Sequence, residues 1–125
     1  MILIGKVCQS VVDFYDSKTR TTRKKARPVL VVGGPRNNDY TVLPISTVKN
    51  RGNLDDEYDL PIELADRAKL NLPEECFVRT HKQMTVHEAS LVRTRGDMRT
   101  DAPDLYLKAL ELMERYQSEL MDQAL

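Results

Sequence analysis

The chain reads Lys24-Lys25-Ala26-Arg27-Pro28-Val29-Leu30-Val31-Val32-Gly33 at the point where a basic segment passes directly into an apolar one. Proline donates no backbone hydrogen bond and therefore suits the first residue of a strand. The apolar residues 29–32 then predict a buried strand that ends at Gly33-Gly34-Pro35. Arg27 is thus expected at the rigid start of a strand, beside a mobile cationic segment, and this arrangement suits the binding of phosphate.

Charge is distributed unevenly along the 125 residues. Residues 1–54 hold ten Lys and Arg against three Asp and Glu, a net charge of +7, whereas residues 55–125 hold nine against sixteen, a net charge of −7. The formal net charge of zero conceals this asymmetry. A basic half that is concentrated in one segment indicates an anionic partner, although charges of both signs also serve simply to hydrate a surface.

Length and cysteine content predict one domain over residues 1–125, large enough to fold without a disulfide or a metal. Cys8 and Cys76 lie far apart and in no CxxC motif, which favours reduced thiols in a cytoplasmic protein. Residues 1–7 are too short for the apolar part of a signal peptide. No apolar run approaches the ~20 residues that a membrane span requires, so the sequence predicts no association with a membrane.

Short apolar segments separated by turn residues predict the strands. These are Ile2–Val7, Val11–Phe14, Val29–Val32, Tyr40–Ile45, Tyr58–Ile62, Cys76–Met84 and Val86–Val92. The connector Gly33–Asp39 is rich in residues that adopt turns and predicts a hairpin. Pro61 restricts its strand to the edge of a sheet. Residues 16–26 have almost no apolar side chain and predict a solvated loop.

Residues 102–123 predict one amphipathic helix. Asp101 is a candidate N-cap, and Pro103 and Asp104 fit the first helical turn. Apolar side chains recur at spacings of three and four: Leu105, Ala109, Leu112, Tyr116 and Leu120, widened by Leu110 and Met113. We therefore expect a mainly β fold, a small antiparallel barrel or strongly bent sheet over about residues 2–98, with the helix packed on it.

Several short motifs follow one another in a recognisable order. They are Gly5-Lys6-Val7, Val12-Asp13-Phe14, Arg27-Pro28-Val29-Leu30-Val31-Val32, Leu43-Pro44-Ile45-Ser46-Thr47 and Leu72-Pro73-Glu74-Glu75-Cys76-Phe77-Val78. In order and spacing they resemble the MazF/PemK family of toxins from bacterial toxin–antitoxin systems, over about residues 4–98. The Arg-Pro strand opening and the Pro-Ile-Ser-Thr strand ending are the most specific parts of the resemblance.

The resemblance implies a small SH3-like barrel related to the CcdB toxin fold, a homodimer and a cognate antitoxin as partner. It implies a sequence-specific endoribonuclease acting on single-stranded RNA, with no metal or other cofactor. In that reaction the 2′-hydroxyl attacks the adjacent phosphate and leaves a cyclic phosphate and a free 5′-hydroxyl. Arg27 matches the catalytic arginine of the family, Ser46 and Thr47 match its pair of hydroxyls, and residues 17–26 match its mobile loop.

The residue types suit this chemistry. Phosphoryl transfer concentrates negative charge on the non-bridging oxygens, to which an arginine presents a planar fork of donors. A hydroxyl such as that of Thr47 can bind the same phosphate or orient the 2′-hydroxyl. A surface ion pair for Arg27, and strand-end capping for Ser46 and Thr47, are the alternative interpretations.

Further residues of the basic half are candidates for contacts with RNA. Backbone phosphates are expected to contact the cations of the loop, which are Lys18, Arg20, Arg23, Lys24 and Lys25. The candidates for base stacking are Phe14, Tyr15 and Tyr40.

The later strand departs from the family pattern. Several members carry an acidic residue and then an arginine near the site, whereas this chain reads His81-Lys82-Gln83-Met84-Thr85, with no arginine. His81 is either a general base, since an unperturbed histidine has a pKa of about 6.5, or a surface residue without a catalytic role. His81, His87 and Glu88 match no zinc motif. The departure keeps two alternatives open: a catalytically weak or inactive binding module, and a CcdB-like inhibitor of a protein target such as gyrase.

Overall fold

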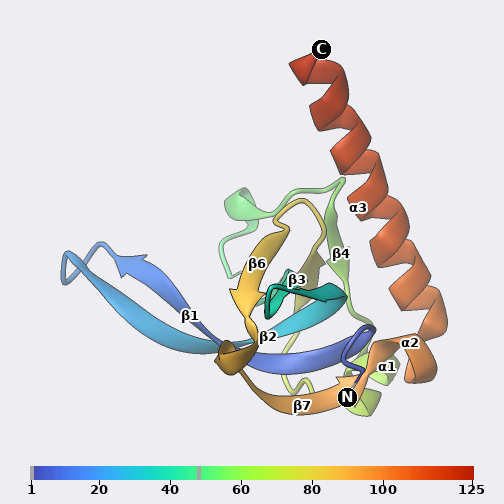
Figure 1. The fold of residues 1–125 in the computed structure, drawn as a ribbon, viewed down its shortest axis with the longest axis horizontal. Helices are drawn as coiled ribbons and strands as arrows, with labels where there is room; N and C mark the ends of the chain where they lie inside the picture. The colour runs from blue at the N-terminus through green and yellow to red at the C-terminus, as the bar shows by residue number, and fades with distance from the viewer. Residues whose placement is uncertain (1, 48) are drawn as a thin grey trace.

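The computed structural model describes residues 2–47 and 49–125, without the side chains of Val12, Phe14 and Tyr15 (Figure 1). Its strands are β1 (Lys6–Asp16), β2 (Thr21–Arg36), β3 (Asp39–Ser46), β4 (Asp59–Pro61), β5 (Phe77–Arg79), β6 (Met84–His87) and β7 (Leu91–Asp97). The helices are η1 (Arg51–Asn53), α1 (Leu64–Lys69), η2 (Glu88–Ser90), α2 (Met98–Asp101) and α3 (Pro103–Ala124). The predicted fold class, mainly β with a C-terminal helix, is confirmed.

The strands form one antiparallel sheet in the order β4-β5-β3-β2-β1-β7, and β6 pairs with β3. Within the described residues the sheet does not close, so the expected barrel is not formed. On its other side β7 is contacted by the segment that follows α1, and not by another strand. Asn71 donates from Nδ2 to the carbonyl oxygen of Arg95 at 2.7 Å, and Arg95 donates from Nη2 to the carbonyl oxygen of Asn71 at 2.7 Å.

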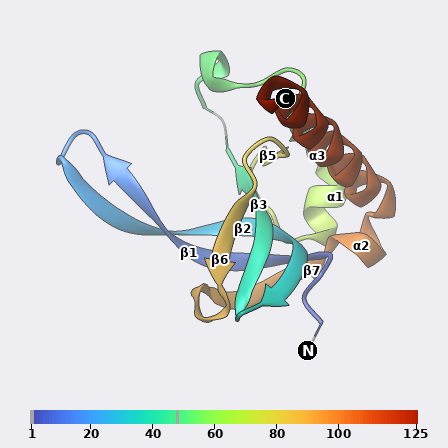
Figure 2. The same ribbon diagram turned by 45° about the horizontal axis from the view of Figure 1, so that its top comes forward.

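The solvated loop predicted for residues 16–26 is wrong in conformation, although residues 17–26 are exposed as expected. β1 and β2 remain paired from Val11↔Ala26 to Asp16↔Thr21 and form a two-stranded arm, residues 11–26, that projects from the body (Figures 1 and 2). The backbone ladder pairs the two strands of the arm, and most of its described side chains are exposed. A prediction based on apolar content therefore missed it.

Pro28 lies inside β2 and not at its start. The residues of β2 before it pair with β1 alone, whereas Val29 pairs with Pro44 of β3 as well. The next residue of β3, Ile45, already pairs with Val78 of β5. The strand β3 thus leaves β2 beside Pro28, which lets the sheet accept a residue without an N–H donor.

The turns and short elements match the sequence in part. The hairpin between β2 and β3 is confirmed, with Asn37 and Asn38 at φ 53° and 68°, as both central residues of a type I′ turn require. The edge strand containing Pro61 is also confirmed, as β4. The single strand predicted over residues 76–84 is wrong, because a turn separates β5 from β6. The short helix α1 was not predicted.

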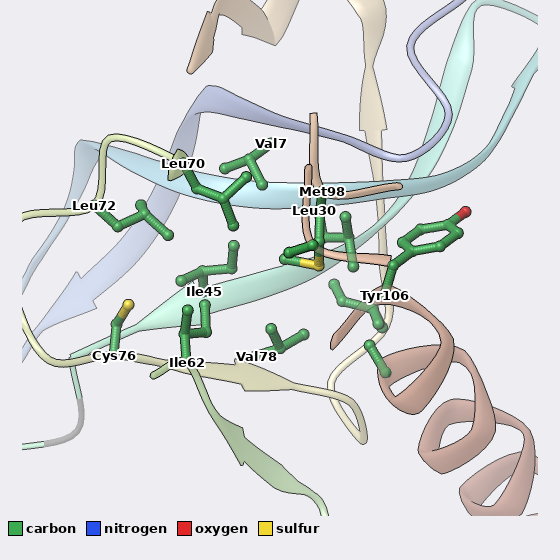
Figure 3. Close-up of a cluster of buried hydrophobic side chains, with 13 residues drawn as sticks. Val7, Leu30, Ile45, Ile62, Leu70, Leu72, Cys76, Val78, Met98 and Tyr106 are labelled. Carbon is green, nitrogen blue, oxygen red and sulfur yellow. The ribbon is translucent and has the colours of Figure 1, made fainter. Parts of the chain in front are cut away.

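Both faces of the central strands are buried, because alternate residues of a strand point to opposite faces. Leu30 belongs to one cluster, drawn as sticks in Figure 3, whose members are Val7, Leu30, Leu43, Ile45, Ile62, Leu70, Leu72, Cys76, Val78, Met98, Ala102, Tyr106 and Ala109. Its neighbours Val29 and Val31 belong to the other, with Cys8, Tyr40, Val42 and Val86. This double burial accounts for the continuous apolar run.

The predicted C-terminal helix is confirmed as α3, but two details are wrong. Ala102, not Asp101, is the N-cap, and it provides no side-chain hydrogen bond. The apolar stripe reaches the core only in part: Ala109 and Leu112 are buried, whereas the side of α3 near Leu120 extends beyond the body (Figure 1), and Leu120 is 44% exposed. No helix within the described residues is long and apolar enough to span a membrane.

Candidate functional site

A groove with a volume of about 780 Å³ opens where β2 and β3 diverge. One wall is formed by residues 25–28 of β2, and the end of β3 with the following segment forms another. The remaining lining comes from the segment before β5 and from one residue each of β5 and β7. The lining residues are Lys25, Ala26, Arg27, Pro28, Ile45, Ser46, Thr47, Lys49, Asn50, Asn53, Leu72, Pro73, Glu74, Cys76, Arg79 and Arg95.

The groove brings together three of the four predicted catalytic residues. Arg27 reaches it from β2, while Ser46 and Thr47 stand at and just after the end of β3. Arg27 and Ser46 are half-buried and Thr47 is exposed. A guanidinium and two hydroxyls therefore line one groove, although 18 residues of the chain lie between Arg27 and Ser46.

Positive charge dominates the groove. Among its described lining residues, five are basic and only Glu74 is acidic. Because alternate residues of a strand share a face, Arg23, Lys25 and Arg27 form one row along β2, and Lys24 lies on the opposite face. We call Arg23, Lys25 and Arg27 the basic row. It leads from the arm into the groove.

The other cations predicted to bind RNA lie on the arm, away from the groove lining. Lys18, Arg20, Arg23 and Lys24 are exposed. Arg23 forms an ion pair with Asp16 at 3.3 Å. Of the stacking candidates, Tyr40 is buried in the core and presents no face to a base, so that prediction is wrong. The side chains of Phe14 and Tyr15 lie outside the described residues.

Arg79 is a groove residue that was not identified from the sequence; it lies at the end of β5, before the segment 81–85 that lacks an arginine. Its Nε donates to Asp59 Oδ1 at 2.9 Å and its Nη2 to Asp59 Oδ2 at 3.1 Å. The sequence held a weak signal, a charged residue directly after buried Val78. Arg95, from β7, is the other missed arginine, and it donates from Nη1 to Gln9 Oε1 at 2.6 Å.

His81, the predicted general base, is not among the groove-lining residues. Its side chain is 13% exposed and packs edge-on against Tyr116 of α3, with ring centroids 6.0 Å apart. Burial lowers the pKa of His81, and the nearby carboxylate of Asp59 offsets this only in part. The imidazole is therefore neutral at pH 7, and its Nδ1 lies 3.8 Å from Asp59 Oδ1.

Two further groups have chemistry of their own near the site. Burial raises the pKa of the Cys76 thiol to about 11, so this lining residue stays protonated at neutral pH and is a poor nucleophile. His87 accepts a hydrogen bond at Nδ1 from the backbone N–H of Ala89 and thereby caps η2. Within the described residues, no group of three His, Cys, Asp or Glu side chains is arranged to hold a metal ion.

Comparison with known proteins gives one clear result. None of the curated proteins matches the chain. The family model of PemK-like, MazF-like toxins of type II toxin–antitoxin systems matches residues 10–113, a range that contains every residue lining the groove. Such a toxin has an antitoxin as its partner. The chain belongs to the PemK-like, MazF-like toxin family of type II toxin–antitoxin systems.

Proposed function

We propose that this protein is a sequence-specific, metal-independent endoribonuclease that cleaves single-stranded RNA by attack of the 2′-hydroxyl on the adjacent phosphate. The observation that carries the proposal is the position of Arg27, Ser46 and Thr47 on one basic groove. Membership of the toxin family supports it. The protein acts in the cytoplasm, where its RNA substrate is found.

In this proposal Arg27 stabilises the transition state. As the 2′-oxygen attacks phosphorus, charge accumulates on the non-bridging oxygens, and the guanidinium donates hydrogen bonds to them. Loss of a donor of this kind typically raises the barrier by ~3–4 kcal/mol. The hydroxyls of Ser46 and Thr47 bind the same phosphate or orient the 2′-hydroxyl, and Arg79 is a second arginine in the groove lining.

The substrate reaches the groove along the basic row. Cations spaced two residues apart on one strand face are suited to successive phosphates of a flexible strand, which is why single-stranded RNA is the proposed substrate. His81 takes no direct part, because it faces α3 and not the groove. Its suggested role as general base is therefore left out of the mechanism.

The antitoxin, in this proposal, covers the same basic surface. A segment that is disordered alone and rich in carboxylates would neutralise the arm while its apolar side chains enter the groove. We also propose a homodimer in which the sheet provides most of the interface. The support is that α3 already buries Tyr106, Ala109 and Leu112 in its own chain.

A direct test is incubation of the purified protein with a long single-stranded RNA in EDTA. The proposal expects discrete fragments with 5′-hydroxyl ends, which a kinase labels without prior phosphatase treatment, and 2′,3′-cyclic phosphate ends. Fragments with 5′-phosphate ends, or a strict requirement for magnesium, contradict it. The variant Arg27→Ala controls for a contaminating nuclease.

A second candidate function is binding without catalysis, either as an inactive toxin relative or as an inhibitor of a protein target such as gyrase. The observation that favours it is the position of His81, since Glu74 is then the main titratable base among the described lining residues. RNA that remains intact at high protein concentration, yet is bound, would support this alternative over the nuclease.

A further inference from the structure

Asp59 is a buried carboxylate beside the groove that the proposed mechanism does not use. It lies in β4 directly opposite Arg79 of β5, and its side chain is 0% exposed. Besides the two bonds from Arg79, its Oδ2 accepts a hydrogen bond from the backbone N–H of Asp55 at 2.8 Å. Asp59 is not among the groove-lining residues, so any effect it has on a ligand in the groove passes through Arg79.

The hydrogen bonds of Arg79 fix the direction of its guanidinium. Nε and Nη2 face the two oxygens of Asp59, and Nη2 also donates to the carbonyl oxygen of Asn53 at 3.0 Å. Nη1 donates to none of the residues that the structure describes. Because Arg79 lines the groove, Nη1 is the nitrogen left to donate to a ligand there.

The chain just before β4 is held in place by contacts of Tyr58, including contacts with α3. Tyr58, the residue before Asp59, accepts a hydrogen bond at its carbonyl oxygen from Thr80 Oγ1 at 2.6 Å, and its own hydroxyl donates to Glu119 of α3 at 2.6 Å. Its ring packs edge-on against Tyr116 at 5.0 Å between centroids. The residue that precedes Asp59 is therefore tied to α3, while the guanidinium that Asp59 holds belongs to a groove-lining residue.

We propose that Asp59 is a positioning residue: its buried carboxylate holds Arg79 side-on, so that Nη1 is directed at the phosphate bound in the groove. The catalytic consequence rests on the proposed nuclease function, but the geometric part does not. An arginine on a flexible side chain loses rotamer entropy when it binds a ligand. Because Asp59 already restricts the rotamers of Arg79, most of this entropy is lost before the ligand binds. Misplacing a group by about 1 Å in such a site lowers turnover by ~10²-fold.

The geometric part is tested by NMR on the intact protein, independently of activity. In the wild type the Nε–H of Arg79 should give a resolved signal that is protected from exchange with water. Asp59→Asn should abolish that protection. Asp55→Asn is the matched control, because it removes a carboxylate charge from the same turn and keeps the acceptor oxygen that binds the N–H of Tyr58. An unchanged Arg79 signal in Asp59→Asn overturns the proposal.

The catalytic part is tested by cleavage kinetics. Asp59→Asn should lower kcat by ~10–100-fold and leave the KM for RNA within ~2-fold, because the groove keeps its other cations. In the Arg79→Ala background the same substitution should have no further effect on kcat. Wild-type kcat in Asp59→Asn, or additive losses in the double variant, overturns the proposal.

One variant covers the case in which Asp59→Asn is too unstable to measure. Arg79→Lys keeps a positive charge beside Asp59 but loses the planar guanidinium that binds both carboxylate oxygens. The variant should therefore fold and show the same loss in kcat. Wild-type kcat in this variant would refute the proposal. If the wild-type protein cuts no RNA, the nuclease function fails, and the NMR comparison still decides whether Asp59 positions Arg79.

Discussion

The arm and the corner where β4 and β5 meet α3 deliver positive charge to the same groove in opposite ways. The arm, residues 11–26, carries exposed cations that are held by little besides its own ladder of hydrogen bonds. The corner delivers Arg79 on a buried carboxylate, 0% exposed, and the residue before that carboxylate is hydrogen-bonded to α3. Exposed cations capture a flexible anion over a long path, whereas a buried and pre-oriented one acts at a single point.

The largest difference expected between the two regions is in folding. Deletion of residues 102–125 removes Tyr106, Ala109 and Leu112 from the core, and a single buried Leu→Ala change alone costs about 2–5 kcal/mol. Since a domain of this size is stable by about 5–15 kcal/mol, the truncated protein should be insoluble or lack cooperative unfolding by circular dichroism.

The matched variant shortens the arm by replacing residues 14–23 with Asn-Gly, which joins the register pair Asp13↔Lys24 through a two-residue turn. This protein should keep a cooperative transition and lose affinity for RNA. A helix-truncated protein that stays folded but becomes monomeric would instead place α3 in the dimer interface.

Next in size is the effect of Arg27. Arg27→Ala should lower kcat by ~10²–10³-fold with the fold intact, because it removes a donor to the transition state. Thr47→Ala should cost less. Arg36→Ala is the control, since this exposed arginine lies at the other end of β2 and outside the groove lining. Cleavage of RNA by Arg27→Ala at the wild-type rate would make Arg27 an ordinary surface residue and the site assignment wrong.

The basic row makes a finer prediction within the arm. Lys25 lines the groove and Lys24 faces away from it, so Lys25→Glu should weaken RNA binding more than Lys24→Glu does. Loss of one phosphate contact should reduce the slope of log K against log salt by about 0.7 for a single strand. Fluorescence anisotropy with a labelled oligonucleotide across a salt series measures both. Equal effects of the two substitutions would show that the arm attracts RNA only through its total charge.

The same contrast explains what the sequence predicts well. The continuous apolar run of β2 and the periodic apolar stripe of α3 are both sequence patterns that predict burial. Arg27 was found because it adjoins the apolar run of β2, whereas Ser46 and Thr47 were found through the resemblance to the toxin family. The pair of Asp59 and Arg79 has no period, since the two residues lie 20 positions apart and meet only because β4 pairs with β5. The pairing of the arm was missed for a different reason: its strands are exposed, and exposed strands leave no apolar pattern in the sequence.

The smallest expected effect is on stability in acid, and it belongs to the corner. Burial lowers the pKa of His81, while Asp59 and Asp55 raise it and Arg79 and Lys82 lower it. The unfolded chain, with a histidine pKa of about 6.5, therefore binds a proton more readily than the folded one. Stability should fall as the pH drops below about 6.5 towards the folded pKa, and should be fully present above 6.5.

His81→Gln should remove this part of the acid sensitivity. The decrease in Tm between pH 7.5 and pH 5.5 should be smaller in His81→Gln than in the wild type, when both are measured by calorimetry in matched buffers. His87→Gln is the control, because His87 is exposed and lies outside the corner. A decrease in His81→Gln equal to that of the wild type would mean that His81 is as well solvated when folded as when unfolded. The corner would then be more open to water than the 13% exposure of that side chain indicates.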